Sequence, residues 1–221
     1  VGRMTKREMT FGWGWLAVQM LVLPSLISSI AAPRGSAAVN FCYHLVSLLA
    51  VTVIFHRYLK QELRNFTAGF KKVLPVIAVS LAVYYVAGEV LLCLITAIEP
   101  GFRNVNDDSV AALRQGNLAL TAVMTVALAP VSEECLFRGL IFGCARKQSR
   151  WAAYAISAAA FGALHVMGYV GSFGAVQLLL CFLQYLPAGL VLAAAMEKTD
   201  SIVTAMCIHA IINAVSMIGI M

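Results

Sequence analysis

The sequence predicts an all-α integral membrane protein, a polytopic bundle of about seven transmembrane helices. Composition is the first reason: 61% of the 221 residues are hydrophobic and only 12% are charged. Soluble domains are typically about 45–50% apolar and about 25% charged. The other two reasons are the length of the apolar runs and the alternation of charge between the loops that separate them.

The apolar runs match the hydrocarbon core of a bilayer, which a helix of roughly 20 residues crosses. Seven windows of about that length are 11–32, 37–55, 73–98, 117–143, 151–169, 173–196 and 202–221. Basic residues precede the first window, as in a signal peptide, but its apolar run is too long for one and further windows follow. No repeat or long linker interrupts the chain, which predicts a single membrane domain over 1–221.

Basic residues mark one side of the predicted bundle. They precede the first window and fill the second, fourth and sixth loops: Arg3, Lys6, Arg7, Arg57, Lys60, Arg64, Lys71, Lys72, Arg146, Lys147, Arg150 and Lys198. The positive-inside rule then predicts a cytoplasmic N-terminus and, with seven spans, an outside C-terminus. The net charge of +6 follows this topology, so we expect the lipid bilayer as a partner and no nucleic acid. The compact length favours a bacterial plasma membrane.

Two polar segments lie between windows. Residues 56–72 place Leu59, Leu63, Phe66 and Phe70 at helical intervals among basic residues, which predicts an amphipathic helix in the inner interface. Residues 99–117 form the largest outer loop, where Asp108 or Ser109 is expected to cap a short helix.

The fourth window carries charge where charge is most unfavourable. Its segment "APVSEECLFRGLIFG", 129–143, contains Glu133, Glu134 and Arg138. Three unpaired charges at a helix centre oppose insertion by about 7–10 kcal/mol. We therefore expect this face to meet other helices or a water-filled cavity.

Helical geometry offsets part of that penalty. Glu134 and Arg138 are four residues apart, so a carboxylate–guanidinium pair can form on one face. Glu133 points about a hundred degrees away and is left without that partner. We expect Pro130 to kink or break the helix just before the pair. A break would place a new helix N-terminus beside Glu133 and Glu134 and favour their ionised forms.

Two later windows carry complementary polar pairs. The segment "FGALHVMG" places Phe161 and His165 one turn apart, and "CIHAIINA" does the same with His209 and Asn213. A single buried histidine is typical of packing, but three polar faces on three helices can satisfy one another. We expect them to meet in one active site.

In order, "EECLFR", "FGALH" and "HAIIN" resemble the three motifs of the CPBP family, also called the Abi or CaaX-protease-like family. The likeness covers about 117–215 and departs from the pattern at none of the motif positions. It implies an intramembrane glutamate endopeptidase that acts on a membrane-associated or lipidated peptide or protein. Bacterial relatives are associated with bacteriocin processing and self-immunity, and some relatives without catalytic residues are scaffolds.

The resemblance also implies roles for the motif residues. Glu133 and His165 would hold and deprotonate a water, with the glutamate as general base. His209 and Asn213 would donate hydrogen bonds to the oxyanion. Arg138 would anchor Glu134. No cofactor is expected.

Three alternatives remain open at this stage. Glu133, His165 and His209 are residue types that bind zinc, although no HExxH helix is present. A non-enzymatic scaffold or immunity protein of the same family would not need the catalytic groups. A proton-coupled transporter would use intramembrane Glu and His, and Glu89, in the middle of the third window, adds slightly to that reading. Glu89 is otherwise expected to line the same cavity or to meet Gln177 or Gln184.

Overall fold

A computed structural model describes residues 4–30 and 36–219 of the chain, and helices carry the fold throughout those ranges. The N-terminal part comprises α1 (Lys6–Leu21), α2 (Leu23–Ile30), α3 (Ala37–Ile54), α4 (His56–Ala68), α5 (Phe70–Ile98) and α6 (Val105–Gly116). A continuous helix follows over 118–145, made of α7 (Leu118–Ala122), η1 (Val123–Leu128), α8 (Ala129–Glu134), η2 (Cys135–Phe142) and α9 (Gly143–Ala145). We call it the central helix. The chain ends with α10 (Arg150–Met167), α11 (Ala175–Thr199) and α12 (Ile202–Ile218).

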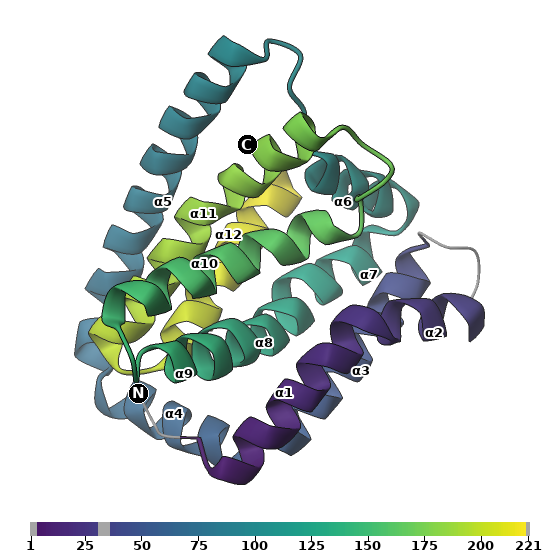
Figure 1. Cartoon of the computed structure of the whole chain (residues 1–221). Coiled ribbons are helices and arrows are strands. Elements are labelled where there is room, and N and C mark those ends of the chain that lie inside the picture. The colour runs from purple at the N-terminus through teal and green to yellow at the C-terminus, as the bar shows by residue number, and fades with distance from the viewer. Residues whose placement is uncertain (1–3, 31–35, 220–221) are drawn as a thin grey trace.

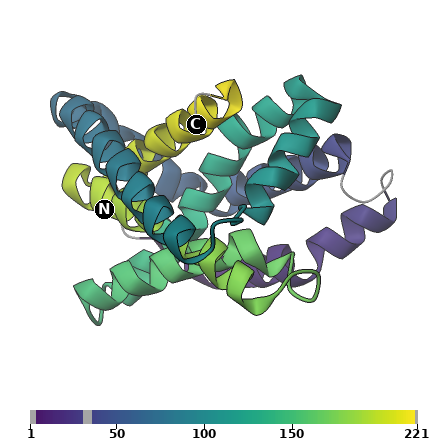
Figure 2. The same cartoon turned by 90° about the horizontal axis from the view of Figure 1, so that it is seen from above.

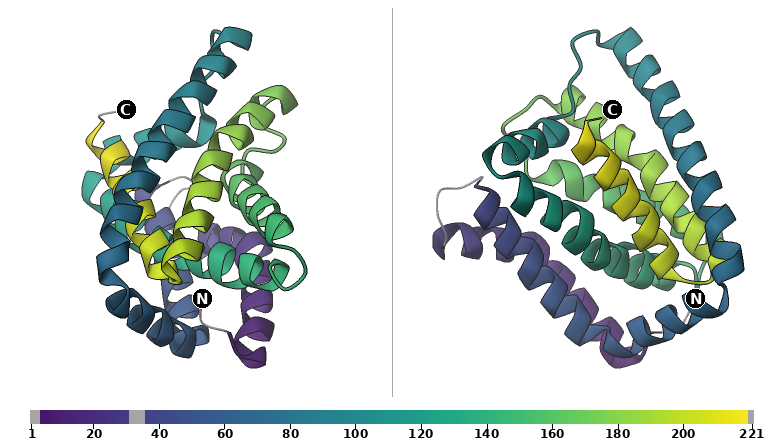
Figure 3. Two further views of the ribbon diagram at one scale, coloured as in Figure 1. Left: turned by 90° about the vertical axis from the view of Figure 1, so that its left-hand side faces the viewer. Right: turned by 180° about the vertical axis from the view of Figure 1, so that it is seen from behind.

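The central helix runs through the middle of the bundle. From behind, α3, the central helix, α12 and α5 follow one another across the molecule (Figure 3). Seen from above, α10 and α12 lie on opposite sides (Figure 2). Residues 132–142 are all buried, as expected of a helix that meets protein on every side.

The predicted all-α bundle is confirmed, but within the described residues only four helices are long and apolar enough to cross a membrane by length and composition. They are α3, α5, the central helix and α11, while α12 is apolar but shorter. Every one of the seven predicted windows contains helix. The first is divided at Val22 between α1 and α2, directly before Pro24, whose missing N–H disfavours a continuous helix.

The basic segments gather at one end of the bundle. In Figure 1 the start of α1, α4 and the turn between α9 and α10 all lie at the lower end, while α6 lies near the upper end. This separation agrees with the alternation of charge between loops. Which end faces the cytoplasm stays a prediction.

The two polar segments form helices, as predicted, but each makes a capping contact that the sequence did not indicate. In α4, Leu63 is 54% exposed, as predicted for an interfacial helix, but Glu62 is buried and its Oε2 accepts from the Ile202 N–H at 2.8 Å. The segment therefore also caps the start of α12. In α6 the predicted caps are wrong: Asn104 is the N-cap, and its side chain accepts from the Asn106 and Asp107 N–H groups.

Helices α10 and α11 approach closely at Gly189. A Cβ built there would lie 2.7 Å from Ala158 Cα and 2.8 Å from Ala158 Cβ. Because these atoms belong to or adjoin the backbone of α10, no side-chain movement can relieve the clash.

We therefore expect Gly189→Ala to destabilise the protein by about 1–3 kcal/mol, because the substitution overpacks this contact. Gly88→Ala on α5 is the matched control, since nothing lies within 4 Å of a Cβ at Gly88. The control should be neutral or stabilising by up to about 1 kcal/mol. Equal unfolding midpoints for both variants in detergent would contradict the close approach.

Candidate active site

The central helix changes pitch around Pro130. Two π-helical segments, η1 and η2, flank the short α-helical stretch that carries Glu133 and Glu134. In η1 the Ala129 N–H donates to the Met124 carbonyl, five residues back. The next donor in that register would be Pro130, which has no N–H, so the Thr125 carbonyl is left without its helical partner.

Asn213 of α12 satisfies this carbonyl. Its Nδ2 donates to Thr125 O at 2.7 Å. The proline thus does not break the helix. It leaves a carbonyl inside the bundle that accepts a hydrogen bond from a side chain of another helix. The predicted break before Glu133 is wrong, and no new helix N-terminus faces the glutamates, because the wider π turn accommodates the proline while the helix continues.

Glu134 and Arg138 form the ion pair that their spacing predicts. Arg138 Nη1 lies 2.9 Å from Glu134 Oε1, and both side chains are completely buried. Arg138 Nη2 also donates to the Gly189 carbonyl at 3.3 Å, and its guanidinium carbon lies 4.5 Å from the centre of the Phe161 ring. The arginine therefore joins the central helix to α10 and α11.

His209 reaches the same carboxylate from α12. Its Nδ1 donates to Glu134 Oε1 at 2.9 Å, so one oxygen accepts from both Arg138 and His209. The other ring nitrogen, Nε2, lies 4.0 Å from Glu133 Oε2, which is too long for a hydrogen bond. His209 stands between the two glutamates and is buried.

Glu133 is buried, and its Oε2 has no hydrogen-bond partner within the described residues. A buried carboxylate oxygen without a donor is unfavourable unless water or substrate reaches it. The buried ionisable groups here are Glu133, Glu134, Arg138 and His209. Together they are neutral when one proton is held by either His209 or a carboxyl group.

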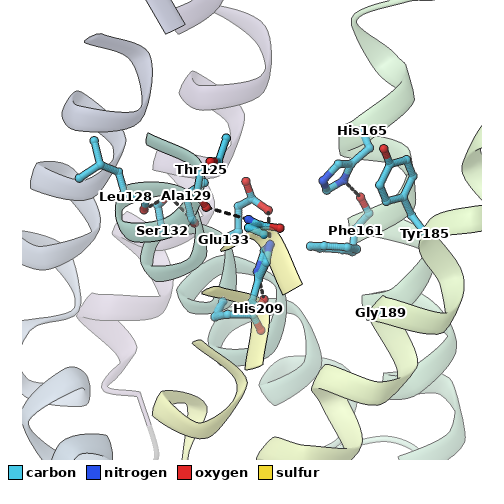
Figure 4. Close-up of polar contacts among 12 residues, drawn as sticks. Thr125, Leu128, Ala129, Ser132, Glu133, Phe161, His165, Tyr185, Gly189 and His209 are labelled. Carbon is cyan, nitrogen blue, oxygen red and sulfur yellow. Dashed lines mark hydrogen bonds and ion pairs between the residues drawn. The ribbon is translucent and has the colours of Figure 1, made fainter. Parts of the chain in front are cut away.

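His165 lies on α10 and points toward the Glu133 side of the site (Figure 4). Its Nδ1 donates to Phe161 O at 2.8 Å. Because a carbonyl only accepts, Nδ1 carries the proton and Nε2 is an unprotonated acceptor in the neutral ring. No hydrogen bond joins His165 directly to Glu133 among the described contacts.

The six predicted site residues thus come from three parts of the bundle. Glu133, Glu134, Arg138 and His209 form one cluster, His165 lies across from it, and Asn213 is held on the central helix by Thr125. That these residues catalyse a reaction stays a prediction.

Sequence reasoning missed three residues near this cluster. Tyr185 of α11 stacks on His165 with ring centres 4.1 Å apart. On α3, which packs against α8 and η1, Tyr43 and His44 have their rings in edge contact. His44 Nδ1 is buried without a hydrogen-bond partner in the described chain. The only available signal was that these are polar aromatic residues within apolar windows.

Glu89 does not join the site. It is exposed on α5, whereas Gln184 accepts from Asn104 and Gln177 donates to the Arg103 carbonyl. Among the described residues, no group of three or more His, Cys, Asp or Glu side chains is arranged to hold a metal ion.

Comparison with known proteins finds a likeness to one family in the C-terminal part of the chain. Residues 115–215 match the family model Rce1-like, described as type II CAAX prenyl endopeptidase Rce1-like. The match includes all three motifs and confirms the predicted family resemblance. No curated protein and no solved structure matches the chain significantly.

Replacing Arg138 with Met should leave Glu134 buried with one donor fewer and lower the free energy of unfolding by about 3–5 kcal/mol. Thermal unfolding in detergent measures the loss. Arg150→Met is the control, because Arg150 pairs with Glu197 at the exposed end of α10, and exposed pairs contribute about 0–1 kcal/mol. Equal losses for the two variants would contradict a structural role of the buried pair.

Proposed function

Because residues 115–215 match the Rce1-like family model of type II CAAX prenyl endopeptidases, we propose that this protein is an intramembrane endopeptidase. It hydrolyses a peptide bond in a membrane-associated protein or peptide with a water activated by Glu133 and His165. The observation that carries the proposal is the buried, unpartnered Oε2 of Glu133 beside an ion pair that already engages Glu134.

The two glutamates have different roles because they have different neighbours. The Oε2 of Glu134 also lacks a hydrogen-bond partner among the described residues, but its Oε1 is held by both Arg138 and His209, so Glu134 acts as a structural anion. Glu133 has no such donor on Oε2 and is available as general base. His165 accepts a hydrogen bond from the same water through Nε2, since its Nδ1 proton is engaged by Phe161.

Charge balance supplies an oxyanion donor at the same time. With both glutamates ionised, the cluster is neutral when His209 is protonated, and the proton on Nε2 then faces the Glu133 side. Asn213 has a second N–H on Nδ2 besides the one bound to Thr125. These two donors stabilise the oxygen of the scissile carbonyl as it becomes an anion.

The reaction then proceeds in two steps. Glu133 takes one proton from water while the hydroxide oxygen bonds to the carbonyl carbon. As the tetrahedral intermediate collapses, the carbon–nitrogen bond breaks and the Glu133 carboxyl gives its proton to the leaving amine. The carboxylate is regenerated, and one water is consumed for each peptide bond.

A prenylated peptide that ends in Cys, two aliphatic residues and one further residue tests the proposal. Protein in liposomes should release the C-terminal tripeptide, measured by mass spectrometry, whereas Glu133→Gln and His165→Ala should abolish release without changing purification or unfolding. The same peptide without its prenyl group tests whether the lipid is required. Wild-type rates in either variant would remove the assigned role, and loss of activity with a strong chelator would favour the zinc alternative.

The oxyanion role of Asn213 is tested separately. We expect Asn213→Ala to lower turnover by about 10²–10³-fold, the usual effect of removing one such donor. Ser132→Ala is the control, because Ser132 is buried next to Glu133 in sequence but bonds only to carbonyls of its own helix turn. It should stay within a few-fold of wild type, and a similar small loss in both variants would argue against oxyanion stabilisation by Asn213.

A further inference from the structure

Tyr185 connects the candidate site to the segment formed by α6 and the residues just before it, 103–116. Its ring lies almost parallel to the His165 imidazole, with an interplanar angle of 23° and ring centres 4.1 Å apart. Phe161 contacts the same imidazole at 4.6 Å and 51°. Figure 4 shows the three rings together, away from the Glu133 and His209 side chains.

The hydroxyl of Tyr185 is fixed by α6 and its cap. It donates to Asp107 Oδ1 at 2.8 Å, with Asn104 Oδ1 a second acceptor at 3.3 Å, and it accepts from Asn106 Nδ2 at 3.0 Å. A tyrosine hydroxyl has one proton and two lone pairs. Its proton and one of its lone pairs are therefore used on one short segment.

That segment is itself attached to the bundle at both ends. At its start, Asn104 Nδ2 donates to Gln184 Oε1 at 2.8 Å, and Gln177 Nε2 donates to the Arg103 carbonyl at 3.2 Å. At its end, Arg114 Nη1 donates to the Met217 carbonyl at 2.9 Å. Because these hydrogen bonds join α6 and its cap to α11 and α12, the groups that bond to the Tyr185 hydroxyl are themselves held in place.

We infer that Tyr185 is a positioning residue that fixes the plane of the His165 imidazole, an inference that rests on the proposed function. The torsion about the Cβ–Cγ bond of histidine is broad and roughly two-fold, so the helix alone does not select one ring orientation. The bond from Nδ1 to the Phe161 carbonyl distinguishes the two flipped orientations, and the stacked phenol resists rotation of the imidazole out of its plane. Nε2 is thereby kept toward the water that Glu133 activates.

The test separates the ring of Tyr185 from its hydroxyl. Tyr185→Leu removes the stacked ring and should lower kcat by about 100-fold with little change in KM, because a catalytic group displaced by about 1 Å loses that much. Tyr185→Phe keeps the ring but loses its anchor on α6, and should lower kcat by about 5- to 10-fold.

The matched control is Tyr169→Leu. Tyr169 also bonds to this segment, from its hydroxyl to Asn106 Oδ1 at 3.4 Å, but its ring packs on Phe173 instead of His165. Its turnover should stay within about 2-fold of wild type, because the bond that is lost is long and no ring is removed from His165. Equal losses in Tyr185→Leu and Tyr169→Leu would overturn the inference, as would a Tyr185→Leu loss that follows unfolding of the protein.

A second measurement does not depend on cleavage. In protein with ¹⁵N-labelled histidine, the two ring nitrogens of His165 should have the shifts of the Nδ1-protonated form in wild type and Tyr169→Leu. In Tyr185→Leu they should move toward the average of the two tautomers. Unchanged shifts in Tyr185→Leu would overturn the inference even if the wild-type protein cleaves peptide. If the wild type cleaves nothing, the proposed function fails, and the nitrogen shifts still decide whether Tyr185 positions His165.

Discussion

The buried pair of Glu134 and Arg138 is the interaction on which the rest of the site depends. It places two opposite charges on one helix turn, away from water, and its shared carboxylate oxygen also holds His209 of α12. Each charge alone would strongly oppose burial. The pair is completed by two further hydrogen bonds, from His209 to Glu134 and from Arg138 to the Gly189 carbonyl. The result is that the central helix, α10, α11 and α12 are joined by contacts that the neighbouring Glu133 does not share.

Pro130 also shapes the site, because it has no backbone N–H. A missing N–H in a π-helical register leaves the Thr125 carbonyl unsatisfied, and Asn213 becomes its donor. Pro130 and Asn213 are more than eighty residues apart in the chain. The N–H that Pro130 lacks nevertheless leaves the Thr125 carbonyl open to the Asn213 amide. The pitch of the central helix is thus part of the site, because π segments present different carbonyls to neighbouring helices than an α-helix does.

Local periodicity accounts for what could be predicted from the sequence. The helices, the Glu134–Arg138 pair and the separate direction of Glu133 follow from helical spacing and from the penalty of burying charge. The contact of His209 with Glu134, the stacking of Tyr185 on His165 and the proximity of α3 depend on how distant helices pack, which spacing does not contain. The expected break at Pro130 was wrong because a helix has a third option, a wider turn, that composition alone does not distinguish from a kink.

Of the two adjacent glutamates, only Glu134 pairs with Arg138 within the described residues, and this difference affects which substitutions the chain can accept over generations. Converting Glu133 to an amide removes one negative charge and leaves the Glu134–Arg138 pair and its contact with His209 in place. Altering Glu134 or Arg138 alone leaves an unpaired ion in the interior and requires a compensating replacement at the other position. With Glu133 as the general base of the proposed function, a single nucleotide change therefore removes the activity while preserving the architecture, and the folded, inert descendant is free to acquire a purely associative role.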